Sequence, residues 1–146
     1  MDQSIDMTIG SDLKEIPAVS ERLEGALAAY GFSPESILDT QLAVEEVITN
    51  VIMHGYKGPG GEIRISCRFA RDDAEIRITD TAPPFNPLTL PEPDLGGDLG
   101  DRKIGGLGVY LVRQVMDEVR YRREDTRNIL TLIKKKNPDR AVSLRG

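Results

Sequence analysis

The chain has 146 residues, of which 39% are hydrophobic, and this length is sufficient for one domain with its own core. A formal net charge of −5 argues against a nucleic-acid binder, and a single cysteine excludes a disulfide framework. The polar first residues are unlike a signal peptide, and no apolar run approaches the length of a membrane span. These properties predict a cytoplasmic protein with one domain at 1–136 and a C-terminal tail at 137–146.

The first third of the chain predicts a strand followed by a helix. Apolar and polar residues alternate over 5–9, which indicates the strand. Asp12 and Glu15 have the spacing of a capping box, so a helix is expected after them. Its apolar positions recur at helical spacing as far as Leu27, and Gly31 is a natural stop.

A second helix is expected after Ser33 and Pro34, which suit the N-cap and first helical positions. It should reach residue 53 or 54 and end at Gly55. Glu46 and Asn50 stand four residues apart on this helix and therefore share one face. A carboxylate can accept a proton, and an amide oxygen can hold a hard cation such as Mg²⁺. Taken alone, however, these residues also fit the solvated face of an ordinary amphipathic helix.

Apolar and polar residues alternate over 63–69 and over 74–78, which predicts a pair of strands. Cys67 lies on the apolar side of the first strand and is expected to be a buried thiol. Continuing the second alternation places Asp80 on the core-facing side, where an unpaired carboxylate is costly. Asp80 is therefore a candidate acceptor at the floor of a pocket, although a turn residue at a strand end is a respectable alternative.

The last part of the chain contains a long loop, a helix and two strands. Residues 82–104 lack any period, residues 107–116 have helical spacing, and strands are expected around 119–121 and 129–133. The predicted fold is an α+β two-layer sandwich, with helices on one face of a mostly antiparallel, mixed sheet. The lysines at 134–136 are expected at a solvated strand end.

Gly105, Gly106, Leu107 and Gly108 precede the last helix, where bare N–H groups and the helix dipole favour phosphate. A flexible hinge is the simpler alternative for so short a glycine run. Thr131 shares strand parity with Ile129 and is a candidate for the same pocket as Asp80, although a threonine at the core edge fits equally well.

These motifs, in this order, resemble those of the GHKL ATPase superfamily, and most of all the anti-sigma-factor serine kinases of the RsbW/SpoIIAB type. The resemblance covers nearly the whole chain. It is carried by Glu46 to Asn50 with the following His54-Gly55-Tyr56, by Asp80, by residues 105–112 running into Met116-Asp117, and by residues 128–132. It implies the Bergerat ATP-binding fold.

The resemblance also implies a role for each candidate residue. Glu46 would be the general base that takes a proton from a partner protein's serine, and Asn50 would hold Mg²⁺ on the ATP phosphates. Asp80 would accept a hydrogen bond from the adenine amine, with Thr131 completing the adenine pocket. The glycine corner, which is Gly105, Gly106, Leu107 and Gly108, would lie against the phosphates, and residues 88–104 would form a lid.

The function implied is an ATP-dependent protein serine kinase and anti-sigma factor in a partner-switching pathway. Its partners would be an anti-anti-sigma (STAS-domain) protein and a sigma factor, and a homodimer is expected. One departure from the family is visible, because Ala82 and Pro84 stand where glycines are common, so the pocket wall must differ. That departure motivates the alternative of a nucleotide-gated protein-binding regulator without kinase activity.

Overall fold

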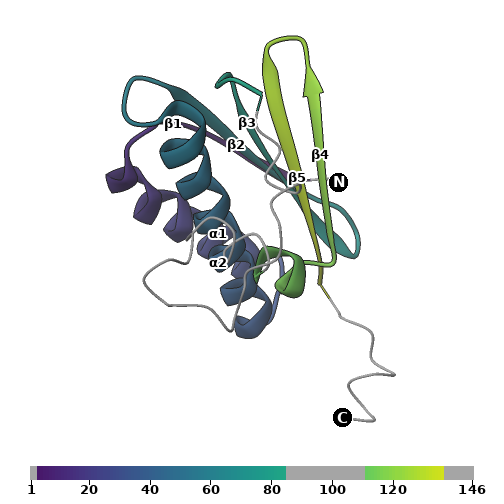
Figure 1. Ribbon diagram of the computed structural model, residues 1–146. Coiled ribbons are helices and arrows are strands. Elements are labelled where there is room, and N and C mark those ends of the chain that lie inside the picture. Colours follow the sequence, from purple (N-terminus) through teal and green to yellow (C-terminus); the bar gives the residue numbers. More distant parts are fainter. Residues whose placement is uncertain (1–2, 85–110, 137–146) are drawn as a thin grey trace, which may run out of the picture.

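The computed structural model describes residues 3–84 and 111–136, which form a five-stranded sheet with helices on one face (Figure 1). The order of strands across the sheet is β1-β2-β3-β5-β4, and every neighbouring pair is antiparallel. The strands are β1 Gln3–Gly10, β2 Glu62–Phe69, β3 Asp73–Asp80, β4 Glu118–Glu124 and β5 Arg127–Lys135. This confirms the predicted two-layer α+β architecture, and no parallel pair occurs within the described ranges.

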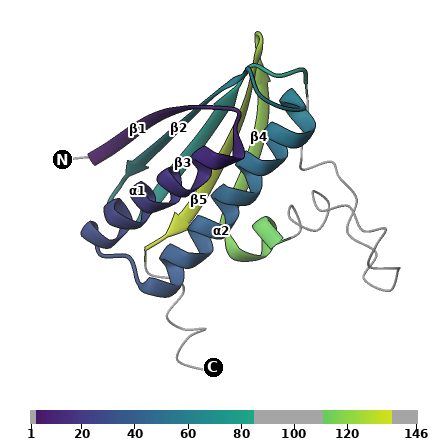
Figure 2. The same ribbon diagram turned by 90° about the vertical axis from the view of Figure 1, so that its left-hand side faces the viewer.

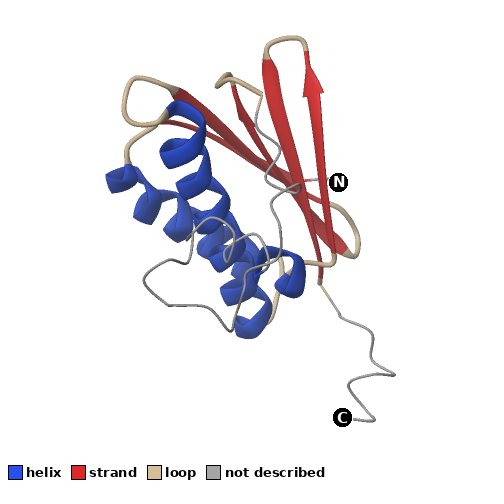
Figure 3. Ribbon diagram, viewed as in Figure 1, coloured by secondary structure: helices blue, strands red, loops and turns tan. Residues whose placement is uncertain are grey.

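The helical layer covers one face of this sheet, as the views in Figures 2 and 3 show. Its elements are the 3₁₀ helix η1 Leu13–Glu15, α1 Ile16–Ala29, α2 Pro34–Asn50 and the π-helix η2 Val51–Tyr56, and residues 111–115 are also helical. Of the predicted helix at 107–116, the part before residue 111 lies outside the described residues.

Local sequence signals explain most of the helix ends. Ser33 caps α2 by accepting a hydrogen bond from the N–H of Ser36 at 3.1 Å, and Gly31 takes a φ of +97° between α1 and α2. The capping box at Asp12 and Glu15 is only half formed. Asp12 caps η1, whereas the Glu15 carboxylate accepts from the N–H of Gly10 at 2.9 Å instead of reaching back to Asp12.

The core lies between the helices and the inner face of the sheet. Alternate residues of β2 and β3 point inward and are almost fully buried, as the period-two pattern predicted. Cys67 is among them, and burial raises the pKa of its thiol to about 12, so it behaves as an apolar side chain.

The outer face of the sheet is polar and carries ion pairs between neighbouring strands or residues. Arg64 pairs with Asp6 at 3.5 Å, and Arg77 pairs with Glu75 at 3.2 Å. These pairs are largely exposed, so each contributes little to stability. The arginines also line a hollow of about 350 Å³, which lies on the opposite side of the sheet from Asp80.

The lysines at 134–136 differ from the solvated strand end that was expected. Lys134 is 7% exposed, and its ammonium pairs with Asp39 of α2 at 3.1 Å and donates to the carbonyl of Val115. Lys136 lies 5.2 Å from the centre of the Tyr30 ring. Two of the three lysines therefore join β5 and the residue after it to the helical layer.

None of the helices within residues 3–84 and 111–136 is long and apolar enough to span a bilayer.

Candidate functional site

Glu46 and Asn50 lie on one face of α2, as their spacing predicted, and both turn toward the interior. Asn50 is 2% exposed and Glu46 is half-buried. Oε2 of Glu46 and Nδ2 of Asn50 are buried atoms without a hydrogen-bond partner. No other side chain that the structure describes contains such an unpaired buried atom. Leaving such an atom unpaired costs about 1–3 kcal/mol, so folded proteins seldom retain one without a reason. A ligand bound beside Glu46 and Asn50 could supply the hydrogen-bond partners that these two atoms lack.

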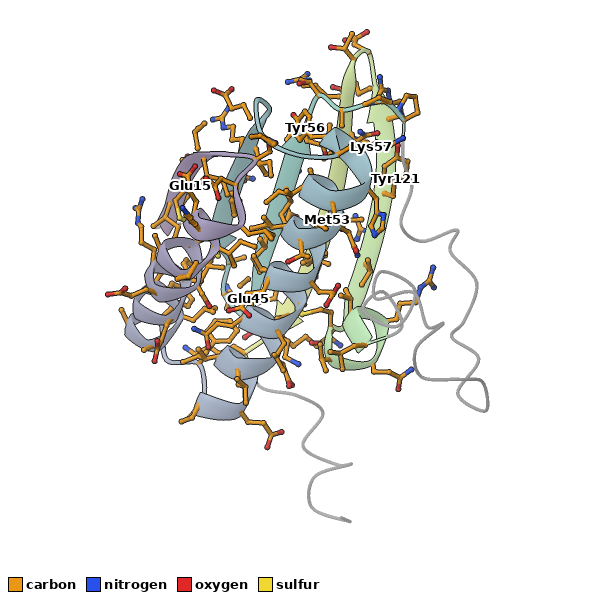
Figure 4. The ribbon with its side chains drawn as sticks, turned by 60° about the vertical axis from the view of Figure 1, so that its left-hand side comes forward. Glu15, Glu45, Met53, Tyr56, Lys57 and Tyr121 are labelled. Atoms are coloured by element: carbon orange, nitrogen blue, oxygen red, sulfur yellow. The ribbon has the colours of Figure 1, made fainter. Side chains whose placement is uncertain are left out.

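The solvated-face alternative fails for this helix because none of the polar residues at 45, 46, 49 and 50 is fully exposed, and Asn50 is buried. Glu45 faces α1, where the hydroxyl of Ser20 donates to its Oε2 at 2.7 Å (Figure 4). Thr49 donates to the carbonyl of Glu45 at 2.7 Å. Glu46 is the half-buried acid without such a partner, and burial raises the pKa of its carboxyl. A carboxylate in this state is a better proton acceptor than an exposed one.

The helix continues past Asn50 as η2, so the prediction that it ends at Gly55 is wrong. The turn widens into a π-helix that ends at Tyr56 and is followed by Lys57 with a φ of +61°. Gly55 instead permits a close approach, because a Cβ at that position would lie 3.2 Å from the Cβ of Ala82. The end of this helix therefore packs directly against the segment that follows β3.

Tyr56 fixes the same contact with hydrogen bonds. The N–H of Thr81 donates to the Tyr56 hydroxyl oxygen at 2.8 Å, and that hydroxyl donates to the carbonyl of Glu62 at 2.6 Å. Thr81 follows Asp80 directly, so the end of β3 and the end of η2 lie together. Tyr56 and Tyr121 are labelled in Figure 4 on η2 and β4, and both pack partly buried against the core.

Asp80 is buried on the inner face of the sheet, as its strand parity predicted, with 5% of its surface exposed. Its Oδ1 accepts from the N–H of Ala82 at 3.0 Å and from Nδ2 of Asn128 at 2.8 Å. Burial raises the pKa of the carboxyl, while the bonds from Asn128 and Ala82 and the charge of Arg123 act in the opposite direction. Both of these hydrogen bonds go to Oδ1, so the carboxylate is held through one of its two oxygens.

The prediction that Thr131 faces the same pocket as Asp80 is wrong. In the register of β3 and β5, Thr131 pairs with Arg77, which points to the outer face, whereas Asp80 pairs with Asn128. Asn128 is 4% exposed and is the residue of β5 that contacts Asp80. The sequence drew attention to Asn128 only as a member of the last strand, because the register across β3 and β5 is a tertiary property.

The glycine corner at Gly105, Gly106, Leu107 and Gly108, and the lid expected at 88–104, lie outside the described residues. The tail at 137–146 does so as well. The helical residues 111–115 that follow the glycine corner are held to α2 and β5, because Lys134 bonds both Asp39 and the carbonyl of Val115.

Asn50 fits a cation that is held mainly by its substrate. Among the described residues there is no cluster of three or more His, Cys, Asp or Glu able to hold a metal ion alone. Mg²⁺ commonly uses one or two protein oxygens together with phosphate oxygens and water. The unpaired atom of Asn50 is Nδ2, a donor that suits a phosphate oxygen, while the amide oxygen of the same side chain is the atom that can hold the ion.

Residues 9–134 match the family described as Histidine kinase-like ATPase domain. The Serine-protein kinase RsbW of Listeria monocytogenes serovar 1/2a is 37% identical over 103 residues, which are 67% of this chain and 66% of that protein. The chain thus spans slightly less than two thirds of that relative. The Serine-protein kinase RsbW of Halalkalibacterium halodurans is 30% identical over 136 residues, which cover 90% of this chain and 83% of that protein.

Two solved structures share the fold at 18% sequence identity. The structure of the RsbU and RsbW domains of Rv1364c from Mycobacterium tuberculosis has a TM-score of 0.64 and covers 90% of this chain and 31% of that chain. The mycobacterial sensor histidine kinase MprB has a TM-score of 0.50, with 92% and 99% covered. At this identity the likeness concerns the architecture, and it agrees with the two-layer fold described above.

Proposed function

Because the chain belongs to the family of histidine kinase-like ATPase domains, we propose that it is an ATP-dependent protein serine kinase and anti-sigma factor in a partner-switching pathway. Its substrate would be a serine of an anti-anti-sigma (STAS-domain) protein. The names of the relatives support this proposal, since they are Serine-protein kinases RsbW. The observation that carries it is the pair of buried, unpartnered polar atoms on Glu46 and Asn50.

Glu46 is the proposed general base. It takes the proton from the partner's serine hydroxyl as that oxygen forms a bond to the γ-phosphorus of ATP. The bond between that phosphorus and the bridging oxygen breaks, and ADP leaves. The raised pKa of Glu46 suits this step, because phosphoryl transfer needs a positioned proton acceptor and little other covalent chemistry from the protein.

Asn50 is the proposed protein ligand of Mg²⁺. When bound, the ion neutralises charge on the transferring phosphates. Asn50 can hold it through the amide oxygen, and its burial on α2 fixes the position of that oxygen one turn beyond Glu46.

Asp80 is the proposed acceptor for the exocyclic amine of adenine, through the carboxylate oxygen Oδ2. The glycine corner, Gly105 to Gly108, is proposed to lie against the phosphates, as it does in the superfamily that this chain resembles. Asn128, which bonds Asp80, is proposed to complete this pocket in place of Thr131. A cytoplasmic homodimer, with a sigma factor as a second partner, completes the proposal.

The direct test is phosphotransfer. The full chain is incubated with Mg-ATP and candidate STAS-domain proteins from the same genome, and phosphoserine is located in the partner by mass spectrometry. We expect transfer to one serine, slowed by about 10²- to 10⁴-fold in Glu46→Gln. ATP binding without transfer to any cognate partner would reject the kinase and favour a nucleotide-gated binding protein.

A further inference from the structure

A network of hydrogen bonds lies behind Asp80, where β3, β4 and β5 end together. Asn128 is at its centre. Its Nδ2 donates to Oδ1 of Asp80 at 2.8 Å, to the carbonyl of Ala82 at 3.1 Å and to the carbonyl of Pro83 at 3.2 Å. One amide thus holds both the carboxylate and the segment that follows it.

Two donors from β4 determine which way this amide points. The hydroxyl of Tyr121 donates to Oδ1 of Asn128 at 2.6 Å, and Nη1 of Arg123 donates to the same atom at 3.1 Å. An inverted amide would place N–H groups against both donors and its oxygen against the carboxylate of Asp80. The orientation in which Asn128 donates to Asp80 is therefore the one that satisfies every group.

Arg123 also holds the segment itself. Its Nη1 donates to the carbonyl of Ala82 at 3.0 Å, while the N–H of Ala82 donates to Oδ1 of Asp80 at 3.0 Å. Ala82 is one of the two positions at which this chain departs from the glycines of the superfamily. In this chain the turn after Asp80 is held by hydrogen bonds from side chains of β4 and β5.

We propose that Arg123 is a positioning residue for nucleotide selection. It orients the Asn128 amide and the turn after Asp80, so that Asp80 presents Oδ2 as an acceptor to a base that carries an exocyclic amine. This inference rests on the proposed function, because it assigns a selectivity device to the same site.

The electrostatics of the site agree with this role. Burial pushes Asp80 toward its protonated form, in which it would donate, and Asn128, the Ala82 N–H and Arg123 each act against that tendency. Arg123 therefore acts on Asp80 directly through its charge and indirectly through the amide. Its loss should weaken the contact with an amine and have little effect on the phosphate end of a nucleotide.

The test compares two nucleotides that differ at position 6 of the purine. ATP carries an amine there, whereas inosine triphosphate carries a carbonyl and a proton on the adjacent N1, and the sugar and phosphates are the same. Calorimetry on the full chain gives both dissociation constants for the wild type, Arg123→Met, Arg123→Lys and Arg122→Met. Arg122 is the matched control, since it is the neighbouring arginine on β4 but faces the other side of the sheet.

We expect Arg123→Met to weaken ATP binding about tenfold, the scale of a lost charge-assisted hydrogen bond. Binding of inosine triphosphate should stay within about twofold on the same grounds, so the selectivity ratio falls. Arg123→Lys should recover part of the ratio, because an ammonium can donate to one of the two acceptors. Arg122→Met should change neither constant.

A residue that served only the fold would affect both nucleotides equally. An unchanged ratio in Arg123→Met, with Asp80→Asn abolishing the preference for ATP, would overturn the inference and leave the proposed function intact. Failure of the wild type to bind ATP would instead overturn the proposed function and this inference with it.

Discussion

At the scale of single residues, the site is distinguished by polar atoms that the fold buries and leaves unpaired. In no other side chain that the structure describes is a buried polar atom left without a partner; Thr40, for example, donates to the carbonyl of Ser36 at 2.8 Å. Glu46 and Asn50 are the exceptions, one turn apart on α2. Such exceptions are expected where a ligand supplies the missing partners.

Replacing Glu46 by Gln removes the proton acceptor and preserves the shape of the side chain. We expect phosphotransfer to fall by about 10²- to 10⁴-fold, the usual contribution of a general base, with ATP affinity nearly unchanged. Single-turnover transfer and equilibrium binding, measured on the same preparation, separate the two effects. A comparable loss of ATP affinity would show that Glu46 contributes to binding instead.

The same substitution should also alter the pH dependence of stability. Burial raises the pKa of Glu46 above its ordinary value of 4.5. Below pH 4.5 the carboxyl is protonated in both states, and the folded protein bears no penalty for ionising it. As the pH rises through the folded pKa, ionisation inside the fold lowers the stability of the wild type but not that of Glu46→Gln.

Glu46→Gln should therefore have the higher Tm at neutral pH, and the difference should disappear in acid. Thermal unfolding of both proteins between pH 4 and pH 8 checks the sign. A variant that is less stable than the wild type at neutral pH would indicate that the ionised carboxylate is stabilised in the free protein.

At the scale of elements, the junction between η2 and the turn after β3 brings the two parts of the site together. Tyr56 is bonded to Thr81 and Glu62 at this junction, and Gly61 lies under its ring. A Cβ on Gly61 would come within 2.4 Å of ring carbons of Tyr56. This glycine is required for the close approach of the ring rather than for its own backbone angles.

Gly61→Ala should displace Tyr56 and lower the free energy of unfolding by about 1–3 kcal/mol, the range for overpacking. ATP affinity should fall too, because the turn after Asp80 loses its hydrogen-bond acceptor. Urea denaturation and calorimetry measure the two effects. The matched control is Gly25→Ala on α1, where nothing lies within 4 Å of the added Cβ and a gain of about 0.5–1 kcal/mol is expected.

At the scale of the whole molecule, the sheet separates two different surfaces. Its inner face carries the core, Asp80 and Asn128, and is covered by α1, α2 and η2 (Figure 2). Its outer face carries exposed arginines and acids in pairs. The proposed nucleotide site lies on the inner side, between the helical layer and the ends of the strands, so a ligand bound there contacts both layers.

Mg-ATP should therefore stabilise the whole domain by mass action. At a concentration of about 100 times the dissociation constant, the gain is about 2.7 kcal/mol, which a thermal melt detects readily. Removing the ion with EDTA should reverse the part of the shift that depends on Mg²⁺. Asn50→Ala should respond to ATP but gain no further stability from Mg²⁺. An undiminished Mg²⁺ effect in this variant would exclude Asn50 as the ligand.

Much of the architecture could be predicted from the sequence because local signals specify it. Period-two alternation identified β1, β2 and β3, and Ser33 and Gly31 marked the ends of helices correctly. The same alternation placed Asp80 on the core side, as observed. The order of the motifs predicted the family, which the match over residues 9–134 confirms.

Other features depended on contacts between distant segments. The sequence offered Thr131 as a member of the pocket that contains Asp80, but the pairing of β3 with β5 places Asn128 beside Asp80. Strand parity shows which residues of one strand share a face. Only the register with the neighbouring strand decides which of the two faces of the sheet that is. Gly55 was expected to end a helix, yet its role is set by Ala82 on another element. Lys134 was expected in solvent, and Asp39 of α2 draws it into the interior.

The amino-acid sequence by itself determined which residues of this protein are chemically capable: the acid and amide one turn apart, the core-facing Asp80 and the glycine corner. Patterns with periods of two and 3.6 residues encode such faces within one element. The tertiary structure alone decided that Arg123 and Tyr121 orient Asn128 behind Asp80. Hydrogen bonds between strands depend on register, and register is fixed only when the whole sheet and its helices pack together.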